Sequence, residues 1–155
     1  MKPERAAIGL DQLPGYYIRR LNQIAVAIFL QETEAHGLTP VQFAALSQVA
    51  RTPGVDQRTL AGSIGLDTST IAGVIDRLEA RDLMRRNASP EDRRVRLLSL
   101  TTEGQKVLRA VEPDMLKAQQ RILKPLPAAE RELFMRMLRK LVDANNELSR
   151  APSEA

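Results

Sequence analysis

The stretch that decides the fold runs from Gln57 to Leu100 and reads QRTLAGSIGLDTSTIAGVIDRLEARDLMRRNASPEDRRVRLLSL. Its first half predicts two short amphipathic helices separated by a turn at Gly65. Its second half predicts two short strands joined by a loop that contains Pro90 and several arginines. In proteins that read DNA, such an order of elements places one helix in the major groove and a basic hairpin beside it.

Capping residues mark both predicted helices of this stretch. Asp56 can cap the first helix, and either Asp67 or Thr68 can cap the second. The strands are expected at residues 83–86 and 95–100, where short aliphatic runs flank a polar loop. The residues expected to face inward from the two helices are Leu60, Ala61, Ile64, Ile71, Val74, Ile75 and Leu78.

Two further helices are predicted before this stretch. Apolar residues recur at three- and four-residue steps through residues 14–36, and Gly37 is placed to end that helix. The next helix begins at residues 39–42, Thr-Pro-Val-Gln, which offer a capping hydroxyl, a proline at the first helical position and a reciprocal glutamine. Pro53 lies at its end. Residues 1–13 are polar and aperiodic and are expected to form a loose arm or a first short turn.

Two more helices are predicted after the strands. The first starts at Thr101 or Thr102 and is long, and Pro113 inside it should remove one backbone hydrogen bond and bend it. The last begins near Ala128 and carries one broad apolar stripe. Residues 149–155 are expected to be a flexible tail. The predicted fold class is therefore mainly α with a small β-hairpin.

The first helix and the last two carry wide apolar stripes but have little central domain to cover. Packing on the same elements of a second copy would bury these stripes, which predicts a twofold homodimer. The alternative is that the stripes close onto the core of their own chain.

Composition narrows the possible functions. The 155 residues are 43% hydrophobic and 27% charged, which is enough for a core and a soluble surface. Cysteine is absent, and this excludes disulfides, thiol catalysis and cysteine-ligated zinc. No apolar run approaches the roughly 20 residues that cross a bilayer, and the N-terminus lacks the apolar segment of a signal peptide, so we expect a cytoplasmic protein without a membrane partner. A formal charge of +4 permits a polyanionic partner without requiring one.

The second predicted helix of the central stretch begins with short polar side chains. Thr68, Ser69 and Thr70 can donate or accept hydrogen bonds at base edges, and their carbon atoms can meet a thymine methyl group. Gly73, one turn further on, would let the helix approach DNA closely. The alternative is that these residues are only a helix cap followed by a tolerated glycine.

The predicted hairpin carries the second DNA-binding signal. Arg93 and Arg94 lie in its loop, where a guanidinium on a narrow projection suits the negative potential of a minor groove. Asp92 could orient an arginine there, with Arg94 or Arg77 as its partner. Further arginines of the hairpin are Arg85, Arg86 and Arg96. The alternative is a solvated edge strand protected by charge, but the helix–turn–helix directly before it favours DNA binding.

The combination of these motifs resembles the MarR family of bacterial transcriptional regulators. The resemblance rests on D-R-L-E at residues 76–79, D-x-R at 92–94 and L-T-x-x-G at 100–104, and it extends from the first helix to about Glu147. It implies an obligate homodimer with a winged helix–turn–helix in each subunit. It also implies dimerisation helices at 14–36 and 102–148 and a DNA-binding domain at 39–100.

The same resemblance implies roles for individual residues. By position, Thr68, Ser69, Thr70 and Gly73 match the major-groove face, and Gln57, Arg58 and Thr59 would meet phosphates. Arg94 matches the wing arginine and Asp92 the acid that steadies it. A dimer presenting two such helices should favour a pseudo-palindromic operator with half-sites about one helical turn apart.

Members of this family carry a small-molecule pocket, and the start of the first helix offers candidate residues for one. Tyr16 and Tyr17 supply flat apolar walls with hydroxyl groups, and Arg19 and Arg20 can clamp a carboxylate. These side chains suit an aromatic carboxylate, a phenolic acid or its thioester as effector. The alternative is that they pack and cap at a dimer interface. His36 is expected to be a helix-end residue instead of a ligand or base.

No constellation in the sequence indicates an enzyme, a metal site or a cofactor. A Cys/His pair is impossible, and G-x-S-x-G and phosphate-cradling glycine loops are absent. The resemblance to MarR regulators implies a ligand-responsive repressor that is released from its operator by the effector. The rival interpretation is a winged-helix module that binds protein, and salt dependence of DNA binding separates the two.

Overall fold

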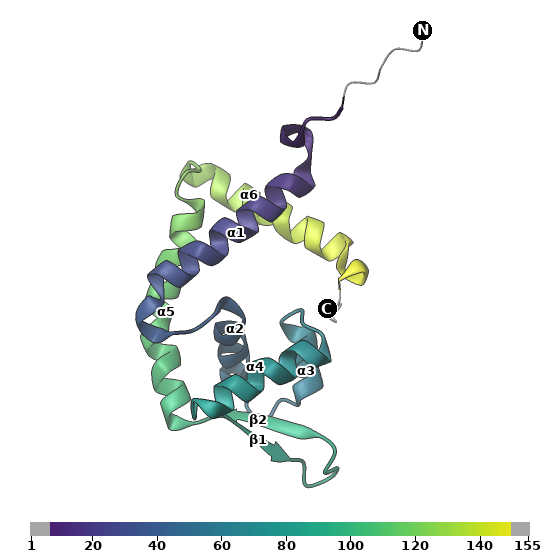
Figure 1. The fold of residues 1–155 in the computed structure, drawn as a ribbon, viewed down its shortest axis with the longest axis vertical. Coiled ribbons are helices and arrows are strands. Elements are labelled where there is room, and N and C mark those ends of the chain that lie inside the picture. Colours follow the sequence, from purple (N-terminus) through teal and green to yellow (C-terminus); the bar gives the residue numbers. More distant parts are fainter. Residues whose placement is uncertain (1–6, 150–155) are drawn as a thin grey trace.

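The computed structural model describes residues 7–149, which are mostly helical with one antiparallel hairpin (Figure 1). A compact unit is built from α2 (Pro40–Arg51), α3 (Gln57–Ser63), α4 (Thr68–Ala80), β1 (Met84–Ala88) and β2 (Arg96–Leu100). The long helices are α1 (Pro14–Glu32), α5 (Thr102–Leu123) and α6 (Ala128–Ala144). Single 3-10 turns form η1 (Leu10–Gln12), η2 (Glu34–His36) and η3 (Asn146–Leu148). The predicted fold class is confirmed.

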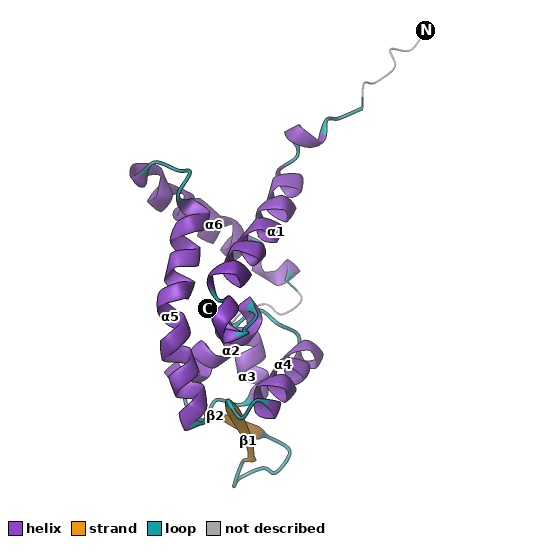
Figure 2. Cartoon of the chain, turned by 60° about the vertical axis from the view of Figure 1, so that its left-hand side comes forward, coloured by secondary structure: helices purple, strands orange, loops and turns teal. Residues whose placement is uncertain are grey.

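Helix α5 connects the two parts of the molecule. It starts beside the hairpin and runs along one side to α1 and α6, which cross at the opposite end (Figures 1 and 2). The helix continues through Pro113 as a single element. A movement of the compact unit relative to α1 and α6 must therefore be accommodated along α5 or in the chain that joins α1 to α2.

The core lies inside the compact unit, where the apolar faces of α2, α3 and α4 meet the hairpin. All seven residues predicted to face inward pack there, six of them buried and Ile64 partly buried. The chain before α3 adds to the hairpin, because Gly54 N donates to Leu98 O at 2.8 Å and Leu98 N donates to Val55 O at 2.9 Å. These backbone bonds hold the start of α3 beside β2, a pairing that the sequence pattern did not predict.

Local capping chemistry sets most helix starts. Thr39 and Gln42 form the predicted capping box of α2. Asp56 caps α3. Of the two candidates for α4, Asp67 is the cap, and its carboxylate accepts from Thr70 N at 2.7 Å. Thr101 caps α5 through its hydroxyl, which accepts from Gly104 N at 2.9 Å.

Three predicted elements had wrong bounds, of which the second strand differs least, since it starts at Arg96 instead of residue 95. The first helix ends at Glu32 instead of His36, and residues 34–36 tighten into η2. Thr33 lies at this break and donates from its hydroxyl to Phe29 O at 2.8 Å, a local bond that competes with regular helix. The first strand spans 84–88 instead of 83–86, because Asn87 and Ala88 pair with β2 although neither is a residue type enriched in strands.

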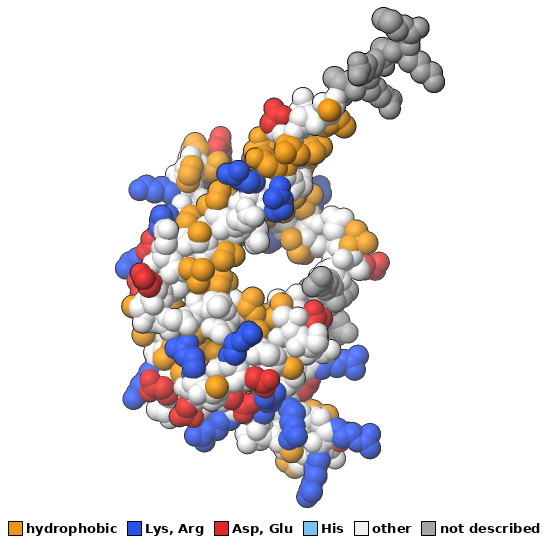
Figure 3. Space-filling model, in the orientation of Figure 1, with side chains coloured by type: hydrophobic (Ala, Val, Ile, Leu, Met, Phe, Trp, Pro, Cys, Tyr) orange, Lys and Arg blue, Asp and Glu red, His pale blue; other side chains and the backbone are white. Residues whose placement is uncertain are grey.

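Apolar side chains remain exposed on α1 and α6. Helix α6 has no buried residue at all. The exposed large hydrophobic residues of the two helices include Tyr17, Ile18, Leu21, Ile24, Leu30, Leu133, Met137, Leu141 and Val142. Figure 3 shows such side chains along the upper part of the molecule. Among residues 7–149, no helix combines the length and apolar character that crossing a bilayer requires.

Candidate nucleic-acid interface

The first turn of α4 presents a polar surface to solvent. Thr68, Ser69 and Thr70 are all exposed. Asp67 accepts from Ser69 Oγ at 2.7 Å in addition to capping the helix, so the Ser69 hydroxyl keeps acceptor capacity toward a ligand. A Cβ placed on Gly73 would meet no described atom within 4 Å. Packing among the described residues therefore does not require a glycine at this position.

The starts of α3 and α4 and the hairpin meet around one hollow. Its volume is about 530 Å³. It is lined by Asp56, Gln57, Arg58, Thr59, Thr68, Arg94, Val95 and Arg96. Three groups of predicted DNA contacts thus converge, although they lie up to 37 residues apart between Gln57 and Arg94 in the chain.

Two side chains at the start of α3 differ in what they can offer a ligand. Gln57 Oε1 is buried and has no hydrogen-bond partner among the described residues, and such a group requires one. Thr59 donates its hydroxyl proton to Asp56 at 2.6 Å, so this proton is already committed. Burial raises the pKa of Asp56, but hydrogen bonds from the Thr59 side chain and backbone outweigh that effect and leave the pKa below its ordinary value.

The hairpin loop carries Arg93 and Arg94, which are both exposed. Asp92 accepts a hydrogen bond from the backbone N of Arg94 at 3.0 Å. The expected pairing of this carboxylate with a guanidinium of Arg94 or Arg77 does not form among residues 7–149, and Arg77 is exposed on α4. Asp92 therefore shapes the main chain on which Arg94 is displayed, because an acceptor two residues upstream closes an Asx-type turn.

Arg86 is attached to α4 and is not available to DNA in the way its position on the hairpin suggested. Its Nε donates to Glu79 Oε1 at 2.6 Å, and its Nη2 pairs with Asp76. Burial lowers the pKa of Arg86, but the bonds to Asp76 and Glu79 outweigh this and raise it above its ordinary value. These pairs hold the hairpin against α4, a role that the sequence reasoning missed. The signal was present in two acids three residues apart on one helix face.

Basic side chains project from the hairpin end of the molecule (Figure 3). Figure 3 shows Lys and Arg side chains projecting from this end, with acidic residues mainly beside them on the neighbouring elements. A basic projection beside a polar helix terminus fits the phosphate backbone and grooves of a nucleic-acid duplex.

The predicted effector residues gather at the start of α1. The rings of Tyr16 and Tyr17 meet edge to face at 5.2 Å, and Arg20 Nη1 donates to the Tyr16 hydroxyl at 3.4 Å. The guanidinium of Arg19 lies 5.7 Å from the Tyr16 ring centre. A hollow of about 630 Å³ is lined by Leu10, Asp11, Tyr16, Tyr17, Arg20 and Ile24, but not by Arg19. The start of α1 lies at the end of the chain's fold opposite the hairpin (Figure 1).

The known proteins to which this chain is similar are transcriptional regulators. The MarR family model matches residues 38–95. The transcriptional regulator HosA of Escherichia coli O111:H- is 36% identical over 72% of this chain and 82% of its own length. The HTH-type transcriptional repressor NicR of Pseudomonas putida is 31% identical over 84% of this chain and 83% of its own length.

Solved structures share the fold over most of this chain. The PcaV regulator of Streptomyces coelicolor, in complex with its natural ligand, gives a TM-score of 0.84 at 37% identity, over 90% of this chain and 98% of PcaV. BpsR of Bordetella bronchiseptica, whose DNA binding is regulated by 6-hydroxynicotinic acid, gives 0.83 at 30% identity, over 89% and 99%. The repressor CouR bound to a 23-mer DNA duplex gives 0.82 at 28% identity, over 90% and 99%.

Proposed function

Because the chain belongs to the MarR family of transcriptional regulators, we propose that it is a ligand-responsive repressor that binds a pseudo-palindromic operator as a homodimer. The convergence of the α3 start, the α4 start and Arg94 on one hollow carries this proposal. Residues 39–100 form the DNA-binding domain, and residues 14–36 and 102–148 form the dimerisation helices. Since its partner is chromosomal DNA, we place the protein in the cytoplasm.

Each part of the interface has a proposed contact. Thr68, Ser69, Thr70 and Gly73 face the major groove, and Arg94 reaches the adjacent minor groove from the turn that Asp92 holds. Gln57, Arg58, Arg77 and Arg93 lie toward phosphates. Thr59 lies beside them, but its hydroxyl and its backbone N both donate to Asp56. At protein–DNA interfaces, contacts in the major groove recognise the base sequence, and charge contacts to phosphates position the protein.

Salt dependence tests whether DNA is the partner. With a duplex selected from a random-sequence library, fluorescence anisotropy should show operator affinity falling steeply as salt rises, because bound phosphates release counterions. A protein making about six phosphate contacts loses on the order of a thousandfold in affinity between 50 and 200 mM salt. No selectable duplex, or a flat salt response, would favour the protein-binding alternative.

The dimer proposal rests on the uncovered stripe of α6. Leu141 is 56% exposed, and a carboxylate at this position would have to be desolvated in an interface. Leu141→Glu should weaken the dimer by about 100-fold, or about 3 kcal/mol, as measured by sedimentation velocity. Lys140→Glu, at the neighbouring exposed position, is the control and should leave the dimer intact. A fully dimeric Leu141→Glu variant would remove α6 from the interface.

The effector proposal is an aromatic or phenolic acid or its thioester. Support comes from Arg20, which lies beside the Tyr16 hydroxyl in the hollow at the start of α1, and from BpsR, which responds to an aromatic acid. A guanidinium binds a carboxylate with two parallel hydrogen bonds, and the tyrosine rings stack on its aromatic part. An effector acts by binding better to a dimer whose recognition helices are wrongly spaced for DNA.

Ligand titration tests the effector class. We expect 6-hydroxynicotinate, 4-hydroxybenzoate or benzoyl-coenzyme A to raise the melting temperature and to lower operator affinity by about 5- to 150-fold. Arg20→Ala should remove this response, and Arg19→Ala, whose side chain does not line the hollow, should retain it. If none of these probes shifts melting or operator affinity, the aromatic-acid class is discarded.

A further inference from the structure

The connector between α1 and α2, residues 33–39, touches the recognition helix. Arg81 follows the last residue of α4 and reaches across to this connector. Its Nη1 donates to Gly37 O at 2.8 Å, and its Nη2 donates to His36 O at 3.0 Å. One guanidinium therefore binds two successive carbonyls, and two such bonds fix its orientation as well as its distance.

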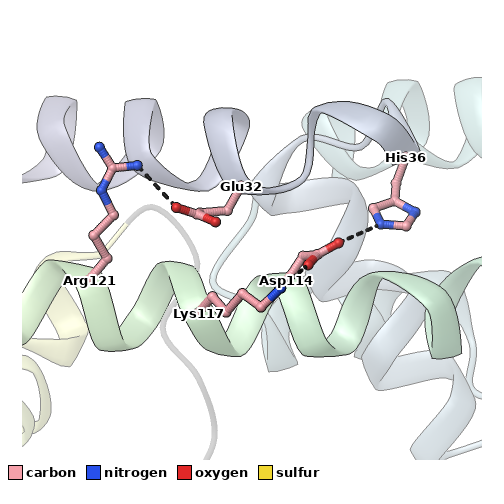
Figure 4. Close-up of polar contacts among 5 residues, drawn as sticks. All are labelled: Glu32, His36, Asp114, Lys117 and Arg121. Atoms are coloured by element: carbon pink, nitrogen blue, oxygen red, sulfur yellow. Dashed lines mark hydrogen bonds and ion pairs between the residues drawn. The ribbon is translucent and has the colours of Figure 1, made fainter.

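The same connector is bound to α5 on its other side. His36 Nε2 lies 3.0 Å from Asp114 Oδ2, and Asp114 Oδ1 lies 3.0 Å from Lys117 Nζ (Figure 4). Hydrogen bonds from His36 and then Lys117 hold the pKa of Asp114 below its ordinary value, so this carboxylate is ionised at neutral pH. Four residues before His36, at the end of α1, Glu32 pairs with Arg121 of α5 at 3.1 Å.

Buried and hydrogen-bonded residues hold the connector in place, so a displacement of α5 against the connector would reach the end of α4. Leu38 is 2% exposed and belongs to the core of the compact unit, and Thr33 is 1% exposed. Thr39 begins the capping box of α2. Gly37 lies at φ +61°, which sets the direction of the chain between these anchors.

We propose that Arg81, His36 and Asp114 are positioning residues for DNA binding, which link the C-terminal end of α4 to α5 through the connector. This inference rests on the proposed function. Helix α4 has 13 residues and is about 20 Å long, so a rotation of about 10° at its anchored end moves Thr68–Thr70 by about 3 Å. A shift of that size removes hydrogen bonds to base edges. None of the three residues lines the hollow between α3, α4 and the hairpin.

Asp114→Ala tests the link between the connector and α5, because it removes the carboxylate that bonds to His36. Removing a negative charge from a DNA-binding protein should by electrostatics alone leave affinity unchanged or increase it. The positioning role makes the opposite prediction, a loss of operator affinity of about tenfold. Glu112→Ala is the matched control, because Glu112 is an exposed acid two residues earlier on the same helix. Equal affinities for the two variants would overturn the proposal.

Arg81→Lys separates positioning from direct charge contact. Lysine keeps the charge but cannot hold both carbonyls in the fixed geometry of a guanidinium. We expect a loss similar to that of Asp114→Ala with an unchanged salt slope, and a double variant no weaker than the weaker single variant. Wild-type affinity for Arg81→Lys, or additive losses in the double variant, would contradict the link.

The distance between the two recognition helices in the free dimer distinguishes a positioning role from a general loss of stability. Because the chain has no cysteine, a spin label at Thr70→Cys reports on the separation of the two recognition helices. Asp114→Ala should broaden or shift this distance by a few Å while the melting temperature and dimer mass stay close to those of Glu112→Ala. An unchanged distance distribution would overturn the proposal. Failure of the proposed function would give a different result, because the unmutated protein itself would then bind no DNA duplex in a salt-dependent manner.

Discussion

Replacing Arg94 with Ala is expected to lower operator affinity by about 10- to 100-fold, the range of one good groove contact worth about 1–3 kcal/mol. Arg94 is exposed in the loop between β1 and β2, and the Asp92 carboxylate holds its backbone N at 3.0 Å. Its side chain lines the hollow that also contains Arg58 and Thr68. A main chain that is fixed before DNA arrives leaves only the Arg94 side chain to be ordered when it binds.

The neighbouring residue supplies the control for this substitution. Arg93 is exposed in the same loop but does not line the hollow, so Arg93→Ala should lose one phosphate contact at most and reduce the salt slope by about 1. Both variants should melt like the unmutated protein, since neither side chain is buried. Anisotropy titrations at several salt concentrations measure both quantities. Equal losses for the two variants would show that charge in the loop, and not the position of Arg94, carries the affinity.

Gly104→Ala is expected to destabilise the fold by about 3 kcal/mol or more, because a backbone atom occupies the place of the new methyl group. A Cβ on Gly104 would lie 1.9 Å from Leu83 O and 2.9 Å from Leu83 C. This carbonyl cannot easily move away, since it accepts from Thr101 N at 3.2 Å and Leu83 is 2% exposed. The first turn of α5 and the start of the hairpin must therefore separate.

Thermal unfolding measures this effect, and a second glycine provides the comparison. For a chain of this size, 3 kcal/mol corresponds to a fall in melting temperature of about 6–12 °C. Gly62 lies inside α3, and a Cβ there would meet no described atom within 4 Å. Gly62→Ala should stabilise the protein by about 0.5–1 kcal/mol, because alanine loses less backbone freedom on folding. A Gly104→Ala variant that melts with the unmutated protein would refute the close packing of α5 on Leu83.

The sequence by itself determined the helix caps and the apolar helix faces, because each depends on residues that are close together in the chain. The caps at Thr39 and Asp56 could be read directly, because a capping side chain bonds to a backbone N–H two or three residues away. The helical stripes could be read because side chains three and four residues apart share a face. The failures at the end of α1 and along β1 arose where a threonine bonded back to Phe29 and where residues of low strand propensity paired in a strand.

Only the tertiary structure decided how these elements act together. It brought Gln57, Thr68 and Arg94 to one hollow, attached Arg86 to the acids of α4, and tied Arg81 and Asp114 to the same connector. Such contacts join residues far apart in the chain, and their distances depend on how helices pack and cross, which periodicity does not specify. Arginine side chains are long and can reach several partners, so their sequence positions left open whether they would bind DNA or another part of the fold.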